Sequence, residues 1–319
     1  MERFDYVIAG GGLAGLSLAC AMVNSPLRDA RVLIIDREAK TSNDRTWCFW
    51  ELHSQSIGQL DSIVTQRWSH LWYIGEQWQK RIDLGDYRYK MIRGIDFYRH
   101  ADELLAAAPN MQRMYGNIEA IEDLTSRKGL PKPAPATPAA PATPAAPATP
   151  AAPATPAAPA TPAAPATPAA PAAVIVDGQR IETDWIFDAR FIPQEFQLDT
   201  LRYHDVKQHF TGWEIETTRD IFDAESASFF DFRTPQKGQM RFMYILPQSP
   251  RRALVEYTLF SQQLLPQKEY EQAIREYLTD VLGLSEQDYR LLDSEKGIIP
   301  MTDQPFRRRP AGTRRILRI

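Results

Sequence analysis

The stretch FDYVIAGGGLAGLSLACAMVNSPLRDARVLIID, residues 4–36, decides the fold of this chain. Residues 4–9 are typical of a buried parallel strand, and residues 13 to about 23 of a helix. Residues 31–36 follow as a second strand, because residues 32–35 form a continuous apolar run. This order predicts a βαβ unit at the start of the chain and therefore an α/β fold.

Three glycines in this stretch, Gly10, Gly12 and Gly15, satisfy the pattern G-x-G-x-x-G where the strand meets the helix. Gly10 permits a tight turn, Gly12 lets the backbone approach a pyrophosphate, and Gly15 allows close helix packing. Asp36 follows Gly15 at about 20 residues, and its carboxylate suits a ribose with free hydroxyls. We therefore predict a bound dinucleotide, with FAD and NAD both open and FAD favoured by analogy with flavoproteins.

The middle of the chain carries a low-complexity insert at residues 131 to about 173. It repeats Pro-Ala-Thr-Pro-Ala-Ala, and a proline at every third position favours polyproline II and prevents helix or sheet pairing. Residues 118–124 before it, and 174–176 and 180–186 after it, read as short strands. The repeat is thus expected to lengthen a hairpin-like loop; a binding role is the alternative, but aromatic or basic specificity residues are missing.

Other segments alternate between strand and helix patterns. Residues 68–74 are strand-like and residues 95–107 have helical spacing. After Arg190 the pattern becomes one of alternating strands, and helical periodicity returns at residues 268–282; the expected strands are 209–216, 228–233, 240–246 and 253–260. This predicts an antiparallel sheet beside the nucleotide-binding part, with a cleft between the two for a large substrate.

Composition excludes several classes of function. The net charge of −3 gives no reason to expect a nucleic-acid partner, although six arginines lie in residues 305–319. Cys20 and Cys48 show neither metal spacing nor a disulfide framework, which suits a reducing cytoplasm, and the five histidines form no ligand pattern. No metal site is expected. No run approaches the ~20 apolar residues of a membrane span, so contact with a membrane is expected only at its surface.

Several segments resemble the bacterial lycopene cyclase family. Residues 43–51, NDRTWCFWE, resemble the family's Thr-Trp-x-Phe segment, and residues 187–190, FDAR, its strand-ending Asp-(Ala/Gly)-Arg motif. Residues 208–214, QHFTGWE, 240–247 and 254–258, LVEYT, resemble its later strands, and residues 297–301 its Gly-x-x-Pro turn. The resemblance runs from residue 1 to about 303, the repeat apart. Because the family continues into a glycine-rich segment, a Thr-Gly-Tyr motif and C-terminal helices, this chain is expected to be C-terminally truncated.

The resemblance implies a Rossmann-like FAD-binding domain with an antiparallel β-sheet substrate domain. The FAD-binding domain is expected over residues 1–130 and, after the insert at 131–173, again over 174–192. The substrate-binding and catalytic region is expected at 193–303, and a basic tail at 304–319.

The resemblance also implies a function: conversion of the acyclic ψ end groups of lycopene to β-ionone rings, in carotenoid biosynthesis. This is an intramolecular lyase (isomerase) reaction that needs reduced FAD, with NAD(P)H as the electron source, but causes no net redox change. Protonation of the terminal double bond gives a tertiary cation, the neighbouring alkene closes the ring, and a proton is lost. Glu256 is the candidate acid, at the family's position for it, since apolar surroundings would keep it protonated. The alternative is an outward-facing strand carboxylate.

Further site residues are expected around the flavin and the substrate. Arg45, Thr46, Trp47 and Arg93 are candidates for flavin contacts, the alternative for the arginines being solvated surface positions. Trp213, Phe242 and Tyr244 could stabilise the carbocation with their ring faces, the alternative being core packing.

The expected partners are lycopene or a related carotenoid and a membrane surface, with the protein cytoplasmic and peripheral to the inner face of the membrane. Two alternatives remain open. One is an FAD-dependent oxidoreductase of the same fold, such as a hydroxylase or a prenyl or carotenoid reductase. The other is a nonfunctional truncated remnant.

Overall fold

The first sheet is built around β1 (Phe4–Ala9), which lies between β2 (Val32–Asp36) and β11 (Gln179–Asp188), all parallel. The computed structural model describes residues 3–52, 60–125, 172–192 and 198–319. The sheet order is β8-β2-β1-β11-β10-β9, with β17 pairing β11, where the added strands are β8 (Met111–Tyr115), β9 (Ile118–Asp123), β10 (Ala172–Val176) and β17 (Ile316–Arg318). The predicted βαβ opening is therefore confirmed.

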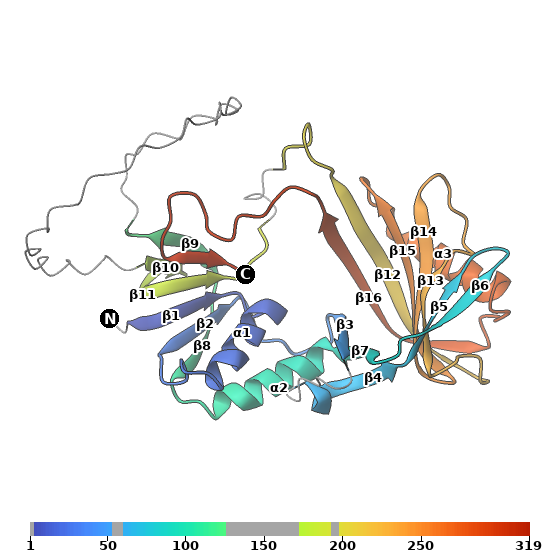
Figure 1. Ribbon diagram of the computed structural model, residues 1–319, viewed down its shortest axis with the longest axis horizontal. Helices are drawn as coiled ribbons and strands as arrows, with labels where there is room; N and C mark the ends of the chain where they lie inside the picture. The colour runs from blue at the N-terminus through green and yellow to red at the C-terminus, as the bar shows by residue number, and fades with distance from the viewer. Residues whose placement is uncertain (1–2, 53–59, 126–171, 193–197) are drawn as a thin grey trace, which may run out of the picture.

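Two helices cover one face of this sheet, as Figure 1 shows: α1 (Leu13–Val23) and α2 (Gly94–Ala106). Their apolar sides share one core with strands β1 and β2, including Ile8, Leu16, Ile34 and Phe97. Leu33, Ile35, Ile186 and Ile316 point to the other face and form a second core. Strands buried on both faces explain the continuous apolar run at residues 32–35.

The ends of the proline-rich insert belong to neighbouring strands of the first sheet. β9 and β10 pair antiparallel, with Asp123 opposite Ala172. The expected hairpin-like connection is thus confirmed, and β10 begins two residues earlier than the sequence indicated, at Ala172. The repeat itself lies almost wholly outside the described residues.

The second sheet has the order β16-β12-β15-β14-β13-β5-β6, and only the pairing of β13 with β5 is parallel. Its strands are β5 (His70–Ile74), β6 (Gln79–Asp83), β12 (Val206–Thr217), β13 (Ser226–Asp231), β14 (Met240–Ser249), β15 (Arg252–Ser261) and β16 (Tyr289–Met301). One face packs against α3 (Gln267–Asp280). The predicted α/β fold with an antiparallel substrate-side sheet is confirmed.

A small third sheet, β3-β7-β4, lies between the two large ones in Figure 1. It consists of β3 (Thr46–Leu52), β4 (Val64–Trp68) and β7 (Tyr87–Arg93), next to a short 3-10 helix at Asp61–Ile63. Trp68 and Met91 of this sheet pack with Leu246 and Leu254 on the face of the second sheet that α3 leaves uncovered. The indole nitrogen of Trp68 also donates to the carbonyl oxygen of Pro247 at 3.0 Å.

Three expectations about elements were wrong. Residues 68–74 are not one strand: Ser69 separates β4 from β5, which belong to different sheets. Residues 297–301 form no turn, because they continue β16 in register with β12, Gly297 lying opposite Phe210. Residues 304–319 are no simple tail, since β17 returns to the first sheet and buries Ile316 there.

Candidate functional site

The glycine-rich turn between β1 and α1 has the geometry of a phosphate-binding loop. Gly10 has φ +114°, a conformation that side chains rarely adopt. A Cβ on Gly15 would collide with the carbonyl oxygen of Gly10, whereas a Cβ on Gly12 would meet no atom within 4 Å. The turn is therefore closed on its helix side and open at Gly12, toward the N-terminus of α1.

A cavity of about 510 Å³ opens at this turn, at the carboxyl ends of the parallel strands. Its lining comes from the glycine turn, from the ends of β2 and β11, and from the β8–β9 connection: Gly10, Gly11, Gly12, Ile35, Asp36, Arg37, Gly116, Asn117, Ile118, Ala189, Arg190, Phe191 and Ile192. The predicted residues Gly10, Gly12 and Asp36 thus meet in one place, while Gly15 serves the packing beneath them.

Asp36 lies at the end of β2, on the wall of this cavity. Its Oδ1 accepts a hydrogen bond from the backbone nitrogen of Arg37 at 2.8 Å. Its Oδ2 is buried and makes no hydrogen bond with the described residues, although Lys40 Nζ lies 3.4 Å away. A buried carboxylate oxygen of this kind suits a hydroxyl donor.

The motif at the end of β11 completes the cavity wall. The backbone nitrogen of Ala189 donates to the carbonyl oxygen of Ala9 at 2.8 Å, which brings β11 beside the glycine turn. Asp188 is buried, and its Oδ1 accepts from Arg190 Nε at 2.8 Å. This pair fixes the Arg190 side chain at the cavity.

The other predicted flavin contacts lie away from the glycine cavity. Thr46 and Arg93, from β3 and the end of β7, line a second cavity of about 20 Å³. Trp47 packs edge-on against Phe97 and Tyr98 of α2 at ring distances of 5.5 and 5.7 Å. Arg45 is exposed and donates to the carbonyl oxygen of Asp44 at 2.6 Å. These four residues were predicted to contact the flavin, and none of them lines the glycine cavity.

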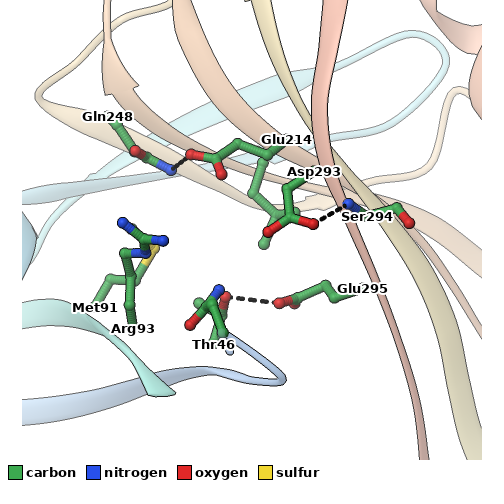
Figure 2. A pocket seen from close by; sticks show the side chains of 10 residues that line it. Thr46, Met91, Arg93, Glu214, Gln248, Asp293, Ser294 and Glu295 are labelled. Atoms are coloured by element: carbon green, nitrogen blue, oxygen red, sulfur yellow. Dashed lines mark hydrogen bonds between the residues drawn. The ribbon is translucent and has the colours of Figure 1, made fainter. Parts of the chain in front are cut away.

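Most of the residues that line the second cavity are polar, and Figure 2 shows their side chains. Thr46, Met91 and Arg93 from the small sheet face Glu214, Asp293 and Glu295 from the second sheet. Arg93 Nε is buried there without a hydrogen bond to the described residues. Glu214 Oε1 accepts from Gln248 at 2.8 Å and from Arg252 at 2.7 Å. The cavity therefore brings three carboxyl groups and one arginine together.

Glu256, the candidate acid, lies on β15 next to this cavity and is only 7% exposed. Burial raises its pKa from the ordinary 4.5 to about 8, with the nearby Glu295 adding to the rise and the Thr258 hydroxyl opposing it. Thr258 donates to Glu256 Oε1 at 2.5 Å. The carboxyl group is therefore held largely protonated at neutral pH, as an acid catalyst requires.

Aromatic side chains surround Glu256 on the same face of the sheet. Tyr244 is its direct partner on β14, and the Tyr244 hydroxyl contacts that of Tyr89 from β7. Phe242 lies two residues away and packs against Phe230 at 4.7 Å between ring centres. Two of the predicted substrate contacts, Phe242 and Tyr244, thus share the face of the acid.

Trp213, the third predicted substrate contact, lies on the opposite face. It is buried in the core beneath α3, where Arg275 covers its ring at 4.8 Å. Strand alternation accounts for this position, because Trp213 follows Gly212, which pairs with Glu256. Trp213 therefore has the alternative role considered from the sequence, which is packing in the core.

The comparison with protein families decides the classification. The lycopene cyclase protein family matches residues 5–129 and 157–316. The chain belongs to this family. The match spans both large sheets, so the resemblance seen in the sequence is confirmed.

Solved structures share the fold of this lycopene cyclase family member at low sequence identity. A geranylgeranyl bacteriochlorophyll reductase-like protein from Thermoplasma acidophilum is 12% identical, with a TM-score of 0.60 over 100% of this chain and 71% of that one. p-Nitrophenol 4-monooxygenase PnpA from Pseudomonas putida is 12% identical, with a TM-score of 0.61 over 100% and 72%. The flavin-dependent monooxygenase PieE, solved with FAD and substrate, is 10% identical, with a TM-score of 0.61 over 100% and 52%. Comparison with curated protein sequences gives no match.

Glu295 is the residue that the sequence reading missed. Its only local signal was its place two residues before Gly297, where the segment expected to form a turn begins. Its neighbours Gly212 and Thr46 are distant in the chain. The pairing of β12 with β16 places Gly212 beside it, and Thr46 of the small sheet donates to it at 2.7 Å.

Proposed function

We propose that this chain is an FAD-dependent lycopene cyclase that converts acyclic ψ end groups to β-ionone rings. The observation that carries the proposal is the burial of Glu256 on an aromatic face of the second sheet, which raises its pKa to about 8. Membership of the lycopene cyclase family supports it.

Glu256 supplies the proton that starts the reaction. It donates to the terminal double bond of the substrate and leaves a tertiary cation, which the neighbouring alkene attacks to close the ring. Loss of a ring proton then forms the cyclic alkene. The buried position suits this step, because exclusion of water keeps the cation from being captured before the ring closes.

The aromatic side chains near Glu256 stabilise the cation. Ring contacts link Tyr244 to Phe229, Phe229 to Phe230, and Phe230 to Phe242. Their ring faces carry negative charge density and attract a cation within about 6 Å. Aromatic and aliphatic walls also match the chemistry of a polyene substrate.

The glycine cavity fits the ADP part of FAD. Gly12 leaves room for a pyrophosphate at the N-terminus of α1, and the buried Oδ2 of Asp36, which makes no hydrogen bond with the described residues, would accept one from an adenosine ribose. Arg190 adds a positive charge to the cavity wall. When bound in reduced form, with NAD(P)H as the electron source, the flavin supplies negative charge that stabilises the cation.

The second candidate is a flavin oxidoreductase of the same fold. The observation in its favour is that the similar solved structures are described as a monooxygenase or as reductase-like. Such an enzyme would change the mass of the carotenoid and would consume NAD(P)H in proportion to product. A cyclase does neither.

We further propose a cytoplasmic protein that meets its substrate at a membrane surface. In the part of the chain that the structure describes, no helix has the length and apolarity to cross a membrane. Lycopene dissolves in lipid, so the enzyme has to take it from there.

The test is expression of the full chain in a lycopene-accumulating host, with pigments separated by chromatography and mass. We expect γ- or β-carotene of unchanged mass, and loss of about 100-fold or more of this product with Glu256→Gln. Glu216→Gln is the matched control, since Glu216 is a carboxylate of β12 that forms an exposed ion pair with Arg290. Unchanged lycopene from a chain that binds flavin would refute the proposal, and oxidised or hydrogenated products would favour the second candidate.

A further inference from the structure

A third cavity, of about 340 Å³, lies on the side of the second sheet that α3 covers. Three basic side chains, those of Lys237, Arg241 and Lys268, share its wall with the acidic side chains of Glu269 and Glu276. None of these five residues lines the glycine cavity or the second cavity. This α3 cavity is therefore separate from the sites described above.

Arg241 brings a buried positive charge to the α3 cavity, since the residue is only 5% exposed. Its guanidinium donates to the Tyr257 hydroxyl at 3.0 Å and to the side-chain oxygen of Gln239 at 2.7 Å. Its Nε is buried without a hydrogen bond, and the guanidinium forms no ion pair, within the part of the chain that the structure describes. Because a buried charge normally has a partner of opposite charge, Arg241 indicates an anionic ligand in the cavity that it lines.

The ionisable side chains near Arg241 in the core beneath α3 do not balance its charge. Burial raises the pKa of Tyr257 and of Tyr270, and it lowers the pKa of His209. All three are therefore uncharged near neutral pH, and none of them can serve as the counter-ion.

The rest of the wall carries charges of both signs. Lys237 and Lys268 are exposed and form no ion pair with the described residues, and Lys268 lies in the first turn of α3, where a helix favours negative charge. With Arg241 they fit a phosphate group. Glu269 and Glu276 are exposed on α3 seven residues apart, and therefore on one side of the helix, where they fit an ammonium group.

Exposed apolar side chains lie next to the α3 cavity. Met240 begins β14 and Leu264 follows β15, and each is the chain neighbour of a residue that lines the cavity. Trp78, exposed in the turn after β5, lies at the same end of the sheet, because β5 and β13 end side by side where β14 begins. Exposed Trp, Met and Leu suit the boundary between lipid headgroups and acyl chains. The ligand is therefore better matched by a lipid headgroup than by a soluble molecule.

An aromatic series connects this end of the sheet with Glu256. Phe242 shares the face of Glu256, and its ring centre lies 6.1 Å from that of Phe232 and 6.2 Å from that of Phe260. Phe232 follows β13 and Phe260 lies near the end of β15, so both are at the end where β14 begins. An apolar substrate that enters here meets aromatic side chains on its way to the acid.

We propose that the α3 cavity binds the phosphoethanolamine headgroup of a membrane phospholipid and so docks this end of the second sheet on the bilayer. The three basic side chains hold the phosphate, and the two glutamates accept hydrogen bonds from the ammonium group. The exposed apolar side chains enter the layer between headgroups and acyl chains. The inference deepens the proposed function and rests on it for its purpose, because it names the surface through which a lipid-dissolved polyene is reached.

The test is flotation of the purified full chain with vesicles of phosphatidylcholine, alone or with an equal share of phosphatidylethanolamine or phosphatidylglycerol. We expect binding about tenfold tighter with phosphatidylethanolamine than with phosphatidylcholine alone, because a quaternary ammonium group cannot donate hydrogen bonds to the glutamates. Soluble glycerophosphoethanolamine should compete for this binding. Equal binding with and without phosphatidylethanolamine, or tightest binding with phosphatidylglycerol, would overturn the proposal.

Two lysine substitutions test the phosphate side of the site. Lys237→Gln with Lys268→Gln should weaken binding to phosphatidylethanolamine vesicles about tenfold. Arg28→Gln with Arg99→Gln removes the same charge from exposed positions beside the first sheet and should leave binding unchanged. Unchanged binding in the lysine variant, or an equal loss in the control, would reject the site.

Glu269→Gln with Glu276→Gln tests the ammonium side. Loss of two negative charges would by charge alone strengthen binding to phosphatidylglycerol vesicles and leave phosphatidylethanolamine vesicles unaffected. We expect binding to phosphatidylethanolamine vesicles to fall about fivefold, because the ammonium group loses its acceptors. No fall in this binding would count against the headgroup.

Met240→Ser with Leu264→Ser distinguishes a membrane lipid from a soluble ligand. These changes should weaken vesicle binding and leave the calorimetric affinity for glycerophosphoethanolamine unchanged. If the unmodified chain binds the soluble headgroup but no vesicle, docking is rejected.

Flotation and the pigment assay fail independently, because flotation requires neither lycopene nor catalysis. Headgroup-dependent binding with unconverted lycopene would refute the cyclase function and leave the docking surface in place. Cyclised product without such binding would do the reverse.

Discussion

The α-carbon of Gly15 faces the carbonyl oxygen of Gly10 so closely that no side chain fits between α1 and the turn before it. Gly12, three residues earlier, faces open space. The two glycines of one motif therefore have different physical tasks, and substitution should separate them.

Gly15→Ala should destabilise the fold and remove flavin, because the methyl group forces α1 away from β1. We expect a loss of about 1–3 kcal/mol, as for other overpacked sites. Gly12→Ala should keep the stability of the flavin-free chain, since its methyl group points into open space, yet lower flavin content by blocking the pyrophosphate. Urea unfolding and flavin absorbance of the purified proteins check both. Equal loss of stability in the two variants would contradict this division.

Glu256 should make stability depend on pH. Below about pH 4.5 the carboxyl group is protonated in the folded and unfolded chain alike. Between about pH 4.5 and about pH 8 only the folded chain keeps the proton, so its stability falls as pH rises, by about 1.4 kcal/mol per unit from this group. Glu256→Gln should therefore gain stability relative to the unmodified chain at pH 9 but not at pH 4. Urea unfolding at both pH values measures the difference, and a gain of equal size at both would be the contrary result.

Ile316 should be a structural residue despite its place near the end of the chain. It is 5% exposed and packs in the second core of the first sheet. Ile316→Ala should cost about 2–4 kcal/mol of unfolding free energy. Ile319→Ala is the control, because Ile319 is 47% exposed, and it should change stability by less than about 0.5 kcal/mol. Similar losses of unfolding free energy in the two variants would show that β17 does not pair with β11 in solution.

Replacement of residues 124–171 by a short turn should preserve the first sheet, because Asp123 and Ala172 are already partners in the β9–β10 ladder. The shorter connection loses less entropy on closure, so a gain of about 2 kcal/mol in stability is expected. Thermal unfolding and flavin content of the shortened chain provide the check. Loss of flavin would mean that the insert does more than connect two strands.

The parts of the fold that could be predicted are those with local causes. The βαβ opening follows from a continuous apolar run, a glycine turn and a helix within 33 residues. Each of these three features is determined by residues that are close together in the sequence. The prediction of a turn at residues 297–301 was wrong. The glycine and proline there lie on β16, an edge strand, and an edge strand tolerates a residue without a backbone N–H donor.

The candidate site could be predicted only in part, because some of its residues come together through contacts between distant parts of the chain. The burial of Glu256 follows from its apolar strand. The position of Glu295 near it, however, depends on the register of β12 and β16. Trp213 was assigned to the substrate because the sequence gives no indication of which face of β12 meets α3. The flavin contact of Thr46 stays a prediction, but nothing in the sequence indicated that its hydroxyl donates to Glu295.

The position of β1 between β2 and β11 has a consequence for synthesis of the chain in the cell. β2 emerges from the ribosome at once, but β11 ends roughly 150 residues later. At roughly 5–20 residues per second, the nascent chain presents an apolar strand edge for on the order of 10 s before its neighbour exists. The yield of folded protein should therefore depend on translation speed and chaperone capacity, not only on the stability of the finished fold.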